Sequence, residues 1–347
     1  MARDRVAGAP YFKSFAVFAR NGGSPLYERL ALDIAGDREM LAFAALARPE
    51  QPQANVLFAA VHALLLSGAK HPLTEYYPSC GGKRAADDGA YPEFKSFVAH
   101  ERERLETLIR TRVTNTNEVG RSALLYPAYD VIAGETDAPL NIIEIGPSAG
   151  LNLNWFRYGY RYLKEAEPLL ARNDRAALFL SSELHGPRQP KLAQHLPEIR
   201  SITGLELNPV ELSSPHERLW LRALIWPERL DRLRRLDAAL AIAEQHPPRI
   251  ERGSASADLA KLIALAPPGP LTIAHTLVTY QFSPEQLAAF EWVLKNASRS
   301  RSIYEVGVEW DGSHYPISLT RYRAGESQRE ELARCDPHGG WIEWLAD

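Results

Sequence analysis

A turn rich in small residues is the segment of this chain best suited to carry chemistry. Residues 141–153 read NIIEIGPSAGLNL, so an apolar run leads through a glycine turn into a second apolar pattern. Glycine lets the backbone approach a ligand closely, and a helix after such a turn offers free N–H groups at its start. A strand, a glycine turn and a helix in this order are typical of nucleotide-type binding. Gly146 and Gly150 are the residues that would let the backbone approach a ligand here.

The same turn allows two other interpretations. Residues 146–150 read GPSAG, a literal G-x-S-x-G, which is the pattern of a nucleophile elbow with Ser148 as the attacking group. Its downstream partners would be Asp258 or Asp311 and His275 or His338. Against this, the preceding 140 residues read helical and the strand carries a glutamate where an elbow strand is usually apolar. In the third interpretation the glycines only permit a tight turn and bind nothing.

A carboxylate stands at the end of the next strand expected in the sheet. Residues 203–209 read TGLELNP, so an apolar run ends in Glu206 before an Asn-Pro turn. Two carboxylate oxygens match the two neighbouring hydroxyls of a ribose, which favours ribose binding. The alternative is that Glu206 caps a turn or pairs with an arginine.

Two candidate catalytic residues follow a central strand. Residues 271–280 read LTIAHTLVTY, and ligands of open α/β sheets bind beyond the carboxyl ends of the strands. His275 and Tyr280 are therefore candidates for contacting the substrate or removing its proton, since histidine accepts a proton near neutral pH. The alternative for His275 is a core histidine with satisfied hydrogen bonds. No zinc-type histidine spacing and no P-loop occurs, so no metal is expected.

The periodicity divides the chain near residue 139. Before it, apolar residues recur at helical spacing over 26–47, 55–67 and 93–113, and after it short β-rich runs alternate with helices. This pattern predicts an α/β fold with a mostly parallel sheet and an antiparallel C-terminal hairpin that closes the edge of the sheet. Residues 1–138 would form a helical cap domain, and 139–347 the sheet domain, with an irregular insertion around 164–200.

The individual elements of the sheet domain are predicted as follows. Strands are expected at 141–145, 177–184, 199–207, 249–252, 271–275, 302–309 and 315–322, the last two joined through Asp311-Gly312. Helices are expected at 151–163, 215–245, 257–266 and 284–297, and the second must break at Trp226-Pro227.

Composition excludes several classes of protein. The chain has 347 residues, of which 45% are hydrophobic and 24% charged, with a net charge of −3, and this argues against a general nucleic-acid binder. Cys80 and Cys335 form no disulfide framework, which favours a reducing cytoplasm. The densest apolar stretch, Val56–Leu66, is too short to span a bilayer, and the first residues lack a secretory signal. We expect a soluble, cytoplasmic protein with a small-molecule partner and neither membrane nor nucleic acid.

The glycine segment resembles the first motif of Rossmann-like S-adenosylmethionine-dependent methyltransferases, an acidic residue followed by three alternating glycines. Glu144, Gly146 and Gly150 match that motif, and Ser148 replaces the middle glycine. The resemblance implies S-adenosylmethionine as cofactor, with its methionine end held by Glu144, Gly146, Ser148 and Gly150. It also implies a contact to adenine in the loop 251–258, where Ser254 takes the place of the usual aspartate.

A wider resemblance covers the whole chain. The segments SPLY (24–27), VHALLL (61–66), YYPS (76–79), TNEVGR (116–121), 145–153, 205–209, 220–227 and 338–344 resemble domain-of-unknown-function family 2332, a bacterial family of uncharacterised proteins. It implies a methyltransferase-like fold without an assigned reaction. The helical half would then cap the substrate side, and Asn117, Glu118 and Arg121 could line the cleft. Arg121 would suit a substrate carboxylate or phosphate. The alternative is a cluster that only caps a helix end.

The sequence therefore predicts a methyltransferase that uses S-adenosylmethionine and acts on an unidentified small molecule. Two alternatives stay open, a serine hydrolase that uses Ser148 and a non-catalytic binding or regulatory protein on a methyltransferase fold.

Overall fold

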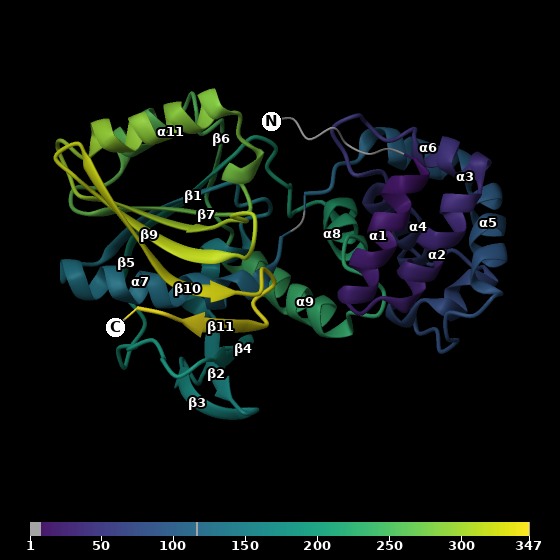
Figure 1. The fold of residues 1–347 in the computed structure, drawn as a ribbon, viewed down its shortest axis with the longest axis horizontal. Coiled ribbons are helices and arrows are strands. Elements are labelled where there is room, and N and C mark those ends of the chain that lie inside the picture. The colour runs from purple at the N-terminus through teal and green to yellow at the C-terminus, as the bar shows by residue number, and fades with distance from the viewer. Residues whose placement is uncertain (1–7, 116, 347) are drawn as a thin grey trace. The chain divides into compact units, whose positions relative to one another are not determined.

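Helical and β-rich elements separate into two units in the computed structural model, which describes residues 8–115 and 117–346 (Figure 1). The sheet unit comprises Asn117–Glu211 and Ala238–Asp347, and the helical unit comprises Ala2–Thr116 and Leu212–Asp237. The division differs from a cut at residue 138. Residues 117–138 group with the sheet, because the helix they form stacks Tyr126 and Tyr129 against Trp155. Residues 212–237 group with the helices, because Trp220 is buried in the helical core.

The helical unit is built around α4 (Gln53–Leu66), whose residues from Ala54 to Leu65 are almost all buried. A helix that is apolar all round belongs in a core, which explains the dense apolar stretch Val56–Leu66. Of the described helices, none is both long and apolar enough to cross a membrane. The predicted break at Trp226-Pro227 is confirmed between α8 and α9. The other elements are α1 (Ala9–Asn21), α2 (Pro25–Gly36), α3 (Arg38–Ala44), η1 (Pro72–Tyr76), η2 (Pro78–Cys80), α5 (Ala90–His100), α6 (Arg102–Thr111), α8 (Pro215–Ala223) and the first half of α9 (Leu230–Gln245).

The sheet unit holds an 11-stranded sheet within its described residues, in the order β3-β2-β4-β11-β10-β9-β8-β7-β1-β5-β6. The strands β6, β5, β1, β7 and β8 are parallel to one another, and β9 runs antiparallel between β8 and β10. The strand bounds are β1 (Leu140–Ile145), β2 (Gly159–Lys164), β3 (Glu167–Arg172), β4 (Phe179–His185), β5 (Ile199–Glu206), β6 (Ile250–Arg252), β7 (Leu271–Thr276), β8 (Ile303–Val308), β9 (Pro316–Arg323), β10 (Glu326–Cys335) and β11 (Trp341–Trp344).

Helices cover both faces of this sheet (Figure 1). Side chains alternate between the faces of a strand, and Ile143 and Ile145 of β1 pack in one cluster with α10 (Leu259–Leu265) and α11 (Pro284–Ala297). Glu144 points to the opposite face, where Tyr129 of α7 (Ser122–Thr136) interacts with it. We call these the α11 face and the α7 face.

Three sequence predictions for the sheet unit are wrong. The expected helix at 151–163 is a short 3-10 helix, η4 (Leu151–Arg157), followed by strand β2, in which Tyr160 and Tyr162 are buried on one face. The insertion around 164–200, expected to be irregular, contributes β3 to the sheet as well as β4, which is the strand predicted at 177–184. The hairpin β8–β9 does not close an edge, because β10, β11, β4, β2 and β3 continue the sheet beyond it.

Candidate functional site

The glycine turn follows β1 at the carboxyl end of the central strands, as predicted. Gly146, Ser148 and Gly150 have φ angles of 65°, 58° and 73°, so three alternate residues are left-handed. A Cβ on Gly146 would lie 2.6 Å from Val278 Cγ2, and one on Gly150 would lie 2.8 Å from Ile250 Cδ1. The packing of the chain itself therefore requires both glycines.

This packing predicts the outcome of Gly146→Ala. The left-handed backbone should cost about 1–2 kcal/mol and the contact with Val278 about 1–3 kcal/mol of unfolding free energy. Adding Val278→Ala should recover only the unfolding free energy that is lost through the contact with Val278. The matched control is Gly134→Ala in α7, where a Cβ meets nothing within 4 Å and no loss is expected. Chemical unfolding of the wild type and these three variants measures this. Full recovery of stability in the double variant would contradict a cost from the left-handed backbone.

Glu206 ties the glycine turn to the neighbouring strand β5. Its Oε2 accepts the backbone N–H of Ser148 at 2.9 Å, and its Oε1 accepts that of Asn208 at 3.0 Å. A carboxylate offers about four acceptor positions, so this leaves capacity for two more donors. The C=O of Glu206 accepts the N–H of Gly253, which brings the loop after β6 to the same place. In that loop Ser254 donates its N–H to Asp258 at 2.9 Å, and its hydroxyl oxygen accepts the N–H of Ala257.

The segment expected to line a cleft lies directly beside the turn. Asn117 Oδ1 accepts the N–H of Leu151 at 3.0 Å, and Gly120 donates its N–H to the buried carboxylate of Glu118. Arg121 Nε donates to the C=O of Pro337 at 3.0 Å. These hydrogen bonds hold the start of η4 and the loop before β11 in place. They are contacts within the chain, and they give the three residues a structural role.

Glu144 is the buried acid of the α7 face and is 3% exposed. Burial raises the pKa of its carboxyl to about 8, which Arg121 opposes and Glu206 reinforces. At neutral pH Glu144 is therefore protonated, and it can donate one hydrogen bond as well as accept. An incoming cation would favour the ionised form, so this acid can respond to a charged ligand.

His275 ends β7 on the α11 face and is held by two carboxylates. Its Nδ1 lies 2.7 Å from Glu309 Oε1 and its Nε2 lies 3.1 Å from Glu305 Oε1. Despite its burial, these hydrogen bonds raise the pKa of His275 to about 9, while His275 holds the pKa of both glutamates below its usual range. An imidazolium that donates through both nitrogens has no lone pair for a proton. We therefore do not assign the proton-accepting role to His275.

The predicted site residues consequently fall into two groups. Glu144, Glu206, Arg121 and the turn share the α7 face, whereas the His275 ring contacts Phe290 of α11, at 5.9 Å between centroids. Tyr280, in η5 (Thr279–Gln281) just after β7, is 56% exposed and can meet a ligand in solution.

The nucleophile-elbow interpretation is weakened by this geometry. Ser148 is only 3% exposed, whereas an elbow presents its serine for attack. Its candidate base His275 is engaged at both nitrogens. The candidate acid Asp311 accepts hydrogen bonds from its own loop, at the N–H groups of Ser313 and His314.

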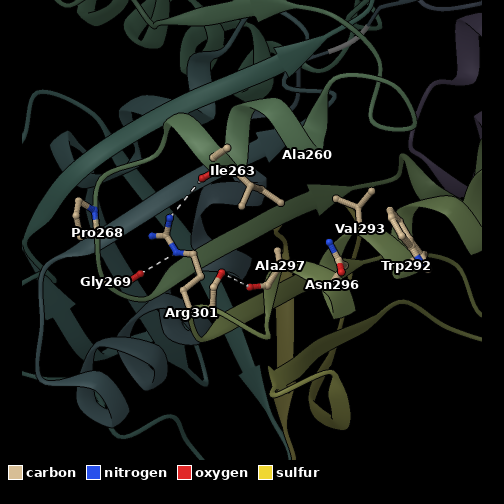
Figure 2. A pocket seen from close by; sticks show the side chains of 11 residues that line it. Ala260, Ile263, Pro268, Gly269, Trp292, Val293, Asn296, Ala297 and Arg301 are labelled. Atoms are coloured by element: carbon tan, nitrogen blue, oxygen red, sulfur yellow. Dashed lines mark hydrogen bonds between the residues drawn. The ribbon is translucent and has the colours of Figure 1, made fainter.

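The sheet unit also contains a separate hollow, whose lining residues are shown in Figure 2. It measures about 410 Å³ and opens between α10 and α11, beside Trp292 and Asn296. Gly269 and Arg301, which also line it, precede β7 and β8, so it lies at the amino ends of those strands. Arg301 donates there to the C=O groups of Gly269 and Pro267. Within the described residues, no group of three or more His, Cys, Asp or Glu could hold a metal ion.

Comparison with known proteins identifies the family. The family DUF2332, described as an uncharacterised protein conserved in bacteria, matches residues 9–344. The chain belongs to DUF2332. No curated protein and no solved structure matches this DUF2332 chain.

Sequence reasoning missed the two glutamates that hold His275 in this DUF2332 chain. Glu305, Gly307 and Glu309 alternate along the expected strand 302–309, so the strand carries two acids on one face. Gly307 leaves room for the ring, since a Cβ there would lie 2.6 Å from His275 Cε1. The sequence did contain a signal for this cluster. Two carboxylates alternate along one expected buried strand, and the neighbouring expected strand ends in a histidine.

Proposed function

We propose that this DUF2332 protein binds S-adenosylmethionine at the carboxyl ends of β1 and β5 and methylates a small molecule. Support comes from the topology. Numbered along the chain, the five parallel strands lie in the order 3-2-1-4-5, the start of the doubly wound order. The order reverses at β1, and ligands of such sheets bind at that switch point. The glycine turn stands there.

The observation that carries the proposal is the hydrogen bond between the carboxylate of Glu206 and the backbone of the glycine turn. One carboxylate receives the turn's N–H and retains acceptor capacity for two hydroxyls at the end of the adjacent strand. That residue type and place fit a ribose. Glu144, Ser148 and the turn would lie by the methionine end, and Ser254 by the adenine.

The bound cofactor would supply an electrophilic methyl group, so the protein's main task is alignment of donor and acceptor. Buried, protonated Glu144 would meet the positive charge of the donor and could lose its proton on binding. Because both ring nitrogens of His275 are hydrogen-bonded to glutamates, Tyr280 is the remaining candidate for contacting the methyl acceptor.

Calorimetric titration with S-adenosylmethionine and S-adenosylhomocysteine tests the proposal. The wild type should bind both, and Glu206→Gln should weaken binding about 10- to 100-fold, because a hydrogen bond to a charged group is worth about 1.5–3 kcal/mol. Gly150→Trp should abolish binding, and thermal unfolding checks that each variant is folded. Tyr280→Phe should retain binding. A folded wild type that binds neither compound overturns the proposal, and binding without turnover on a broad acceptor panel would leave a non-catalytic role.

A further inference from the structure

Two sequence segments of the helical unit have no part in the proposed donor site, and they meet in the fold. His62 lies in VHALLL on α4, and Ser79 lies in YYPS on η2. His62 Nε2 is 2.7 Å from Ser79 Oγ. His62 Nδ1 is 3.0 Å from the C=O of Ala223, at the end of α8.

These two contacts fix the protonation of the ring. A carbonyl oxygen only accepts, so Nδ1 of a neutral His62 must carry the hydrogen. The lone pair then lies on Nε2 and accepts the hydroxyl hydrogen of Ser79. Burial lowers the pKa of His62 to about 4, so the ring is neutral at pH 7. A hydroxyl, a base and a group that orients the base form the arrangement of an activated nucleophile.

The two partners differ in access, as such an arrangement requires. His62 is completely buried in α4, while Ser79 is partly exposed. The backbone of Ser79 is fixed as well, because its N–H donates to the C=O of Pro227 at 3.1 Å. Base and hydroxyl are therefore held by packed elements on both sides.

Two buried hydroxyls lie beside this pair. Tyr27 and Tyr77 are at most 2% exposed, and within the described residues their hydroxyls have no hydrogen-bond partner other than each other. They interact with each other and with Cys80, and the ring of Tyr77 lies 5.5 Å from that of His62. Burial raises the pKa of both phenols, so they remain donors. If one of these hydroxyls donates to the other, the second still has a hydrogen to donate. Unsatisfied buried donors are rare, and a donor near a nucleophile can stabilise an oxyanion.

The neighbouring thiol is a weaker candidate for the nucleophile. Cys80 Sγ lies 3.9 Å from Ser79 Oγ, and burial raises the pKa of the thiol. It therefore stays protonated at neutral pH, and the reactive species of cysteine is the thiolate. The hydrogen bond to His62 is made by the hydroxyl of Ser79, so Ser79 is the better candidate.

We propose that Ser79 is a nucleophile, activated by His62, that attacks a small activated carboxylic ester. The Ser79 oxygen bonds to the acyl carbon while its proton moves to His62 Nε2. The intermediate expels the alcohol, which takes that proton and leaves an acyl-serine. Water then releases the acid by the same two steps, so ester and water give acid and alcohol. This activity is independent of the proposed methyl donor.

A fluorophosphonate probe tests the assignment on the full chain. The Ser79 oxygen should displace fluoride from phosphorus, and mass spectrometry should find one adduct on the peptide containing Ser79. Ser79→Ala should lose the adduct. His62→Gln should slow labelling at least about 100-fold, the lower range for a general base. Cys80→Ala, the matched control, should label at the wild-type rate, and denatured wild type should not label.

The outcomes separate this activity from a structural hydrogen bond. No adduct on folded wild type, an adduct on a residue other than Ser79, or equal rates for wild type and folded His62→Gln overturns the proposal. If His62→Gln does not fold, the comparison of wild type with Ser79→Ala still decides. Labelling of Ser148 instead would transfer the hydrolase assignment to the glycine turn.

Discussion

Replacing Glu309 by alanine should lower the unfolding free energy of the sheet unit by about 3–5 kcal/mol, the usual effect of removing one partner of a buried ion pair. Glu309 accepts from His275 and from the N–H groups of Val278 and Thr279. Without its carboxylate, the buried imidazolium loses one of its two acceptors, and the two N–H groups lose this acceptor. Glu309→Gln keeps one oxygen and should fall between wild type and Glu309→Ala.

Native-state hydrogen exchange measures this effect locally, which matters because a chain of two units need not unfold in one step. Amides of β7 and β8 should lose protection in Glu309→Ala. Glu326→Ala, on an exposed position of β10, should change the stability by less than about 0.5 kcal/mol. Unchanged protection of both strands in Glu309→Ala would show that the carboxylate does not hold His275.

The pH dependence of stability should change when Glu144 becomes glutamine. The pKa of Glu144 is about 8 in the fold, above its ordinary value near 4.5. Between these values the unfolded chain has released the proton that the fold retains, so stability falls as pH rises, by up to about 1.4 kcal/mol per unit. Glu144→Gln removes this slope. It should match wild type near pH 4.5 and be the more stable protein at pH 8.

The difference between the two unfolding profiles isolates Glu144 from the His275 cluster. The raised pKa of His275 contributes stability that is complete below about 6.5 and is lost as pH rises through about 9. The lowered pKa values of Glu305 and Glu309 contribute stability that is lost as the pH falls into the acid range. Both proteins share these effects. Parallel profiles for Glu144→Gln and wild type from pH 5 to 8 would contradict a protonated Glu144, and Glu326→Gln controls for surface charge.

The central strands and the place of the turn could be predicted because local pattern determines them. The buried runs at 141–145 and 271–275 and the break before Pro227 each depend on a few neighbouring residues. The helix expected after Gly150 was wrong for a tertiary reason. The tyrosines at 158, 160 and 162 alternate with period two and are buried, and Tyr160 and Tyr162 lie in strand β2. The apolar residues before them have a spacing that resembles that of a helix. The continuation of the sheet through β11 and β4 depends on pairing between distant segments.

The site was predictable to the same degree. The position of Glu206 beside the turn follows from strand order and the common carboxyl edge. The state of His275 could not be foreseen, because its partners come from β8, and the register of β7 and β8 decides which side chains meet. The dyad of His62 and Ser79 likewise depends on how α4 packs against η2.

The pairing of β4 with β11 bears on the order in which the ribosome makes these parts. Strand β4 is complete at His185, but its parallel neighbour Trp341–Trp344 emerges only after more than a hundred further residues. During that interval one edge of β4 lacks its native partner, and open edges invite pairing with other chains. The helical unit is likewise incomplete until residues 212–237 have been synthesised. Nascent chains halted between residues 186 and 340 should therefore depend most on chaperones.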